Sequence, residues 1–224
     1  MCGRFALDAN PKQFAEHFHL TGEIDFHPSW NIAPSTKIFS ITANEDGARH
    51  LKKMRWGLIP SWAKDAAIGN KLTNARGETV AEKPSFRSAF KARRCIIPAS
   101  GFFEWKTENG IKQPFYISFK SGEPMAFAGI WEAWHPKDGD IVETCCIITT
   151  TPNSLMAQIH DRMPVILPPE QWNIWLSQQE RQADKLIPLV CPHKSESMRA
   201  WPVTREVNKV GLRNDVGLIE PITM

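Results

Sequence analysis

Apolar positions along this chain recur mostly with the two-residue period of β-strands. Turn-forming residues separate these runs, and Asn44-Glu45-Asp46-Gly47 and Glu108-Asn109-Gly110 each predict a tight hairpin turn. The run at 144–150 is apolar enough for a central strand, while 49–56 returns antiparallel to 37–42 with basic residues on its outer face. The expected strands cover 37–42, 49–56, 94–98, 102–106, 114–120, 125–131, 144–150 and 164–167.

Helical patterns are few and short. Residues 11–20 begin with a proline and place Phe14 and Phe18 four positions apart on one face. Similar patterns predict helices at 84–94, at 151–159 and from Pro168 onward. Many strands with scattered short helices indicate a single α+β domain over residues 1–224, built on an antiparallel or mixed sheet.

Composition narrows the class of protein. Hydrophobic residues make up 42% of the chain, but no run approaches the ~20 apolar residues of a membrane helix, and no signal peptide is recognisable. We therefore expect a cytoplasmic protein without membrane contact. The five cysteines are odd in number and Cys145-Cys146 sit in an apolar run, which favours buried free thiols over disulfides. Cys191-Pro192-His193 has no second pair at zinc spacing, so we expect no metal or other cofactor.

Charge is distributed unevenly. The net charge is +3, yet residues 49–94 hold 12 Lys and Arg against 3 Asp and Glu. Such a basic segment in a nearly balanced chain favours a polyanionic partner such as nucleic acid. The alternative is a solvated basic surface. Nine tryptophans against one tyrosine provide large flat side chains, which either fill a core or stack on bases.

The first four residues, Met1-Cys2-Gly3-Arg4, carry a distinctive chemistry. If Met1 is removed, Cys2 presents an amine and a thiol on adjacent carbons. The amine condenses with an aldehyde to an imine, and the thiol then closes a five-membered thiazolidine. An α-amine with a pKa of ~7.7–8.0 is partly neutral, and so nucleophilic, near pH 7. The alternative is a terminus that frays in solvent.

Six stretches together resemble the SOS-response-associated peptidase (SRAP) family. One small departure is Phe103, where the family often has tyrosine. Each motif alone is weak, whereas six in order from residue 2 to about 167 are specific. They are Met1-Cys2-Gly3-Arg4, Asn31-Ile32-Ala33-Pro34, Trp56-Gly57-Leu58-Ile59-Pro60, Asn74-Ala75-Arg76-Gly77-Glu78, residues 94–105 and Ile159-His160-Asp161-Arg162-Met163-Pro164.

The resemblance implies a protein that recognises abasic sites in single-stranded DNA and bonds to them covalently through Cys2. It also implies release of Met1, by self-cleavage or by an aminopeptidase, and a compact barrel-like sheet with flanking helices. A residual lyase activity from the imine stage is a further expectation. We expect a monomer that associates with the nucleoid when bound to DNA.

Four residues form the expected catalytic set: Cys2, Asn74, Glu104 and His160. Glu104 lies between two aromatic residues, where burial raises a carboxyl pKa and suits it to acid–base work; the alternative is a surface pair with Lys106. His160 is expected as a second proton carrier, or else as a partner of a helix C-terminus. Asn74 is expected to hold the sugar, or else to stabilise a turn.

A second set is expected to bind DNA. Guanidinium groups suit phosphate oxygens, and proline and indole rings pack on bases or sugars. For any single arginine the alternative is a surface ion pair of little energetic value. The set comprises Arg4, Asn31, Pro34, Trp62, Arg76, Trp105, Thr149 and Arg162.

Two other function classes compete with this interpretation. N-terminal-nucleophile amidohydrolases also begin Met-Cys-Gly, with the thiol attacking an amide, but they need no basic face. A non-covalent module for single-stranded nucleic acid would leave Cys2 without a role. A general protease has only the family name to support it, because no separate protease constellation is present.

Overall fold

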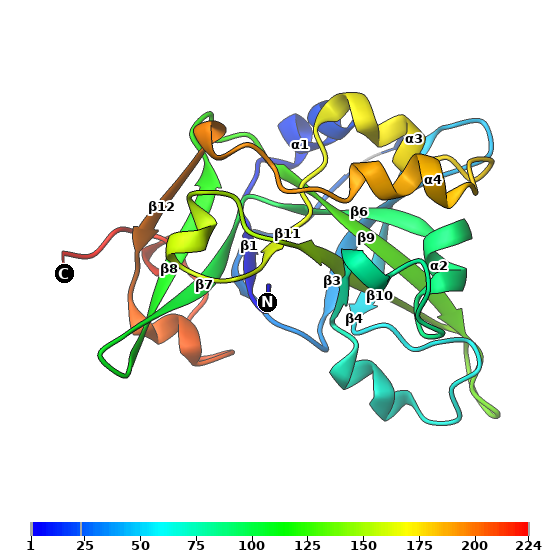
Figure 1. Ribbon diagram of the computed structural model, residues 1–224, viewed down its shortest axis with the longest axis horizontal. Coiled ribbons are helices and arrows are strands. Elements are labelled where there is room, and N and C mark those ends of the chain that lie inside the picture. Colours follow the sequence, from blue (N-terminus) through cyan, green and yellow to red (C-terminus); the bar gives the residue numbers. More distant parts are fainter. Residues whose placement is uncertain (1, 23, 224) are drawn as a thin grey trace.

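The computed structural model describes residues 2–22 and 24–223, and its centre is a closed five-stranded barrel (Figure 1). Strand β10 pairs with both β4 and β9, and the path β10-β4-β3-β6-β9 returns to β10. The barrel strands are β3 (Lys37–Ala43), β4 (Arg49–Trp56), β6 (Arg94–Ala99), β9 (Met125–Trp134) and β10 (Val142–Thr150).

Strand β10 changes partners along its length. Its first half pairs in parallel with β4, and its second half, 147–149, pairs in parallel with β5 (Asn74–Arg76). On the other edge it leaves β9 and pairs antiparallel with β11 (Met163–Pro164). The segments that carry Asn74 and the residues preceding β11 therefore meet at the C-terminal end of β10.

A second sheet has the order β12-β8-β7-β1-β2 and lies beside the barrel (Figure 1). Its tight β7–β8 hairpin turns through Asn109 and Gly110, both at positive φ (50° and 76°), as the sequence predicts. The short β1 is central because it pairs antiparallel with both β2 and β7. The strands are β1 (Phe5–Leu7), β2 (Ser29–Ile32), β7 (Gly101–Glu108), β8 (Ile111–Phe119) and β12 (Met198–Pro202).

Short helices cover the outside of the sheets, with α1, α3 and α4 along one edge of the view and α2 at the barrel end (Figure 1). Asn10 caps α1, because its side chain accepts the backbone N–H groups of Lys12 and Gln13. The α-helices are α1 (Pro11–Phe18), α2 (Arg87–Ala92), α3 (Trp172–Leu176) and α4 (Ala183–Leu186). The short 3₁₀ helices are η1 (Ala66–Lys71), η2 (Gly77–Thr79), η3 (Met156–Gln158), η4 (Pro169–Gln171), η5 (Ile187–Leu189), η6 (Ser195–Ser197), η7 (Arg205–Asn208) and η8 (Val216–Leu218).

Most of the core lies within and around the barrel. Large fully buried side chains include Trp56, Phe127 and Trp175. The expected burial of Cys145 and Cys146 is confirmed, and each of the five cysteines is free. Within the described residues no helix has the length and apolar character that crossing a membrane requires.

The α+β class and the barrel-like core are confirmed, but several element boundaries are wrong. The expected helices at 11–20 and 84–94 shrink to 11–18 and 87–92. The expected helix at 151–159 is a single turn over 156–158, ahead of which the Asn153 side chain accepts the N–H of Met156 (2.9 Å). Strands β1, β2 and β5 have three or four residues each, too short for a periodic signal, and were not expected.

Candidate active site

The described chain begins at Cys2, which lies buried against the second sheet. Its neighbour Arg4 is fixed there, because the Arg4 carbonyl accepts the N–H of Phe103 on β7 (2.9 Å). Burial, and then the negative charge of Glu104, raise the pKa of the Cys2 thiol well above its ordinary value. The thiol is therefore protonated as it lies in the fold. Release of Met1 concerns a residue outside those described and remains a prediction.

Asn74 reaches Cys2 from the barrel. Its Nδ2 donates to the Cys2 carbonyl (2.9 Å), and β10 holds its backbone by pairing Ile147 with Asn74. The alternative of a turn-stabilising asparagine is wrong, because Asn74 lies on a strand. Its Oδ1 is buried and has no hydrogen-bond partner among the described residues, so it retains the capacity to accept a hydrogen bond.

Glu104 is a buried carboxyl group on β7, with 1% of its surface exposed. Loss of hydration on burial raises its pKa from 4.5 to about 7. The alternative of a surface pair with Lys106 is wrong, because Lys106 pairs with Glu108 instead. A carboxyl that titrates near neutrality is suited to accept and donate protons at physiological pH.

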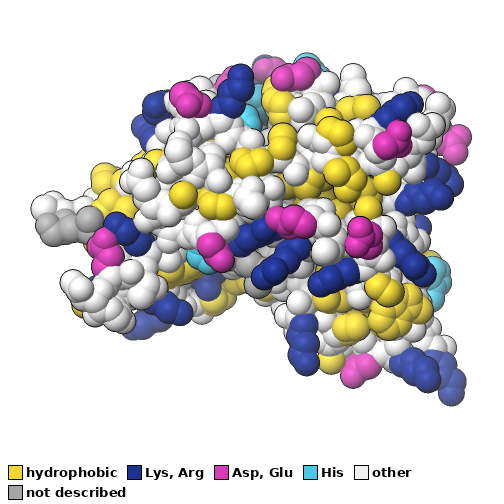
Figure 2. Space-filling model, viewed as in Figure 1, with side chains coloured by type: hydrophobic (Ala, Val, Ile, Leu, Met, Phe, Trp, Pro, Cys, Tyr) yellow, Lys and Arg dark blue, Asp and Glu magenta, His cyan; other side chains and the backbone are white. Residues whose placement is uncertain are grey.

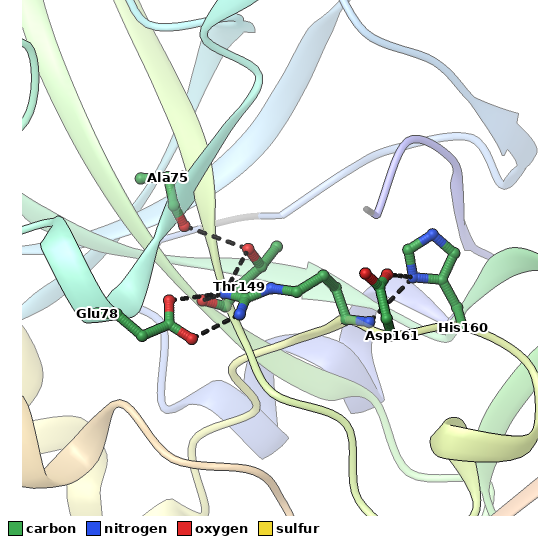
Figure 3. A network of polar contacts seen from close by, with 6 residues as sticks. Ala75, Glu78, Thr149, His160 and Asp161 are labelled. Carbon is green, nitrogen blue, oxygen red and sulfur yellow. Dashed lines mark hydrogen bonds and ion pairs between the residues drawn. The ribbon is translucent and has the colours of Figure 1, made fainter.

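His160 lies beyond η3, with its ring directed at Glu104. Nε2 of His160 is 3.8 Å from Oε2 of Glu104. Nδ1 is 3.0 Å from the backbone nitrogen of Arg162 and 2.9 Å from Oδ1 of Asp161 (Figure 3). Partial burial lowers the pKa of the His160 imidazole. The two titratable groups thus have pKa values shifted toward each other, which favours proton exchange between them.

A concave region of about 540 Å³ opens beside this pair. Trp105 forms one wall, and its Nε1–H donates to Oδ1 of Asn208 (2.8 Å), which fixes the indole. Solvent or a ligand therefore has access to the acid–base pair from one side. The lining residues are Glu104, Trp105, Thr107, Lys112, His160 and Asn208.

Two residues of the expected DNA-binding set are bonded to each other. Nη1 of Arg4 donates to Oδ1 of Asn31 (2.6 Å) and to the carbonyl of Val207. Nδ2 of Asn31 donates to the same carbonyl (3.3 Å). These bonds connect β2 and the segment before β1 to η7, and they hold the Arg4 side chain in one orientation.

Arg162 and Thr149 belong to a second network (Figure 3). The guanidinium of Arg162 binds both carboxylate oxygens of Glu78 (2.5 and 2.9 Å) and the carbonyl of Thr149 (2.8 Å). The Thr149 hydroxyl in turn contacts the carbonyl of Ala75 (3.4 Å). The Arg162 side chain is only 11% exposed, so this fork also anchors the loop that carries His160.

The remaining three residues of that set lie at the surface. Arg76 is exposed at the end of β5. Trp62 is 58% exposed in the loop after β4, and its indole N–H lies 3.4 Å from the carbonyl of Pro84. Pro34 is half-buried beside Ser35, whose φ is +69°. DNA contact by these residues stays a prediction.

Part of the positive charge in the basic segment 49–94 is structural. Arg49 and Arg94 are buried and donate to backbone carbonyls, so the expected position of basic residues on the outer face of the β3–β4 hairpin is wrong for Arg49. Lys52 and Arg93 pair with acidic groups. Figure 2 shows Lys and Arg interleaved with Asp and Glu on one face of the molecule. The exposed cations of the segment are Lys53, Lys64, Lys71, Arg76, Lys83, Arg87 and Lys91.

The structure brings the four expected catalytic residues to one place where the two sheets meet. Sequence reasoning missed two residues of these networks: Asp161, which contacts His160, and Glu78, which pairs with Arg162. Glu78 lies two residues after Arg76 in one motif of the resemblance, and Asp161 directly follows His160 in another. Their position inside these motifs was the only signal in the sequence that could have identified them. Among the described residues, no three His, Cys, Asp or Glu side chains are grouped to hold a metal ion.

Known proteins resemble this chain in sequence and in structure over most of its length. A profile of the family "SOS response associated peptidase (SRAP)" matches residues 1–210. The abasic site processing protein YoqW of Bacillus subtilis is 46% identical over 93% of this chain and 94% of its own. YedK of Escherichia coli, of the same description, is 31% identical over 99% and 100%. The crystal structure of a Bacteroides thetaiotaomicron protein superposes with a TM-score of 0.88, at 29% identity over 99% and 100% of the chains. The chain described here therefore belongs to the SRAP family.

Proposed function

We propose that this protein captures abasic sites in single-stranded DNA by covalent reaction with Cys2. The observation that carries the proposal is the position of Cys2: Asn74 holds its carbonyl, and the charge of Glu104 acts on its thiol. The names of the relatives YoqW and YedK, abasic site processing proteins, agree with this substrate. The proposal requires prior release of Met1, which frees the Cys2 amine.

The reaction balances without a cofactor. An abasic deoxyribose is in equilibrium between a closed hemiacetal and an open aldehyde. The Cys2 amine adds to the aldehyde carbon and water leaves, giving an imine. The Cys2 thiol then adds across the C=N bond, its sulfur going to carbon and its proton to nitrogen, to close a thiazolidine. One water is lost overall, and removal of the imine blocks the β-elimination that would cleave the strand.

Glu104 and His160 carry the protons in this scheme. Ring opening needs an acid at the ring oxygen, and loss of water from the carbinolamine needs an acid at the departing hydroxyl. A carboxyl with a pKa of about 7 supplies either proton and, as a carboxylate, relays the thiol proton to the imine nitrogen. The nearby imidazole, 3.8 Å away, serves as the second carrier.

The buried Oδ1 of Asn74 is the natural acceptor for a hydroxyl of the opened sugar. An abasic nucleotide has no base to unstack, so presenting it to Cys2 costs less than flipping a normal base. Autoproteolysis, a lyase side reaction, a monomeric state and association with the nucleoid belong to the same proposal.

A single incubation tests whether the protein captures abasic DNA covalently through Cys2. Protein whose Met1 release has been verified by mass spectrometry is mixed with single-stranded DNA carrying one abasic site, and the products are separated on a denaturing gel. We expect an adduct that survives heat and detergent, absent with Cys2→Ala and absent on intact DNA. Failure to form it overturns the proposal. Ammonia release from glutamine would instead indicate an amidohydrolase, and salt-reversible binding alone would indicate a non-covalent module.

A further inference from the structure

We propose that Asp161 is a positioning residue that sets the tautomer and protonation state of His160. The inference rests on the proposed function, because it gives Asp161 a part in the proton transfers of that reaction. Nδ1 of His160 has two polar neighbours, and each requires the opposite protonation of that atom. Nδ1 of His160 lies 3.0 Å from the backbone nitrogen of Arg162 and 2.9 Å from Oδ1 of Asp161 (Figure 3).

The two neighbours cannot both bond to Nδ1 in the same state of the ring. The N–H of Arg162 needs a lone pair on Nδ1, whereas the carboxylate of Asp161 needs a proton there. A neutral imidazole carries one proton, on Nδ1 or on Nε2. The Arg162 N–H therefore stabilises the tautomer with its proton on Nε2, and Asp161 stabilises the tautomer with its proton on Nδ1.

The choice of tautomer decides what His160 does toward Glu104. With the proton on Nδ1, the lone pair of Nε2 faces Oε2 of Glu104 at 3.8 Å and accepts a proton from the protonated carboxyl once the two atoms approach to hydrogen-bond distance. The product is an imidazolium that donates from Nδ1 to Asp161 and whose Nε2–H faces the Glu104 carboxylate. The proton moves only from Glu104 to His160, and none is transferred to Asp161. Without Asp161 the ring rests in the form that can only donate from Nε2.

The charged groups facing His160 among the described residues are Glu104 from β7 and Asp161 and Arg162 from its own loop. Burial lowers the pKa of His160, and the charge of Asp161 opposes that shift. The Asp161 side chain is 88% exposed, so solvent and salt screen its field. We therefore expect removal of this charge to lower the pKa of His160 by roughly half a unit, a threefold change in the imidazolium-to-imidazole ratio.

Nuclear magnetic resonance of the whole protein measures this directly. Two-bond ¹H–¹⁵N spectra of ¹⁵N-histidine-labelled protein report both the pKa and the tautomer, and His160→Gln identifies the resonance. We expect Asp161→Asn to lower the His160 pKa by roughly half a unit and to move the neutral ring toward the Nε2–H form. Asp161→Glu should restore both readouts. Asp25→Asn, which removes another exposed carboxylate, is the matched control and should change neither.

Capture of abasic DNA gives the second readout. In the Asp161→Asn protein, the inflection of the pH–rate profile that reports His160 should move to lower pH, by the same amount as the pKa measured by NMR. An unchanged His160 pKa and tautomer in Asp161→Asn, or in Asp161→Ser should the first variant not fold, would overturn the inference. If wild-type protein forms no adduct, the proposed function fails on its own account, and the titration still decides the role of Asp161.

Discussion

Replacing Glu104 with glutamine should stabilise the fold at alkaline pH while slowing capture of the abasic site. Glutamine keeps the shape of the side chain but cannot ionise, and so cannot exchange the protons that ring opening and imine formation need. Glu104 is 1% exposed and its pKa is raised by burial, which means that the native state prefers the neutral acid. Stability and reactivity therefore place opposite demands on this carboxyl.

The size of the expected stability change follows from the difference between the pKa of Glu104 in the native state and its pKa in the unfolded state. The native carboxyl titrates near 7 and the unfolded one near 4.5. Below the unfolded pKa both states are protonated, and the native preference for the neutral acid is fully satisfied. As pH rises through 4.5 only the unfolded state ionises, and the native state loses stability until its own pKa is passed. A shift of this size corresponds to about 3 kcal/mol of unfolding free energy, lost between about pH 4.5 and pH 7.

Denaturant unfolding of wild type and Glu104→Gln at several pH values isolates this contribution, because other titrating groups cancel in the difference. We expect the variant to gain roughly 2–3 kcal/mol relative to wild type between pH 4 and pH 8. Glu108→Gln, on the same strand but exposed, is the matched control and should show no such trend. Crosslinking by Glu104→Gln should be at least tenfold slower, with non-covalent affinity for the same DNA retained.

Two results would refute this reasoning. Parallel curves of unfolding free energy against pH for wild type and Glu104→Gln would mean that the native carboxyl titrates at its ordinary pKa. An undiminished crosslinking rate would remove Glu104 from the proton transfers, whatever its pKa.

Three further predictions follow from the same site. Asn74→Ala removes the donor to the Cys2 carbonyl and should slow crosslinking about fivefold with little change in non-covalent binding; an unchanged rate would contradict the assigned contact. Glu78→Gln weakens the fork on Arg162 and should cost at most about 1 kcal/mol in denaturant unfolding, since Glu78 is half exposed; a stabilised variant would speak against the network. If about four phosphates are contacted, log affinity for single-stranded DNA should fall with log salt at a slope near −3, whereas a flat response would count against a basic binding surface.

Prediction from sequence succeeded where the pattern was long and periodic. The hairpin of β3 and β4 follows from alternation along two strands and from the turn residues between them, and the buried strand β10 follows from its apolar run. The closure of the barrel was not visible in the pattern, because it depends on β10 pairing in parallel with β4, some 90 residues earlier in the chain. The resemblance to a family supplied the barrel-like core instead.

The sequence allowed the residues of the candidate site to be named, but not most of the partners that surround them. Cys2 and Glu104 were named from their chemistry together with the resemblance to the family, and burial of Glu104 between aromatic neighbours was a correct inference from its position. The partners of the arginines could not be read from the chain. Arg4 binds Val207, 203 positions away, and Arg162 binds Glu78, 84 positions away, so only the folded topology brings these charges and acceptors together.

The central claim is that the Cys2 amine and thiol both bond to the aldehyde carbon of an abasic site. The most direct measurement is mass spectrometry of the adduct after digestion with trypsin and nuclease, without borohydride reduction. The account predicts an N-terminal peptide lacking Met1, with the sugar phosphate attached to Cys2 and one water lost. A modification mapped to a lysine, an adduct seen only after reduction, or an unmodified Cys2 peptide would contradict it.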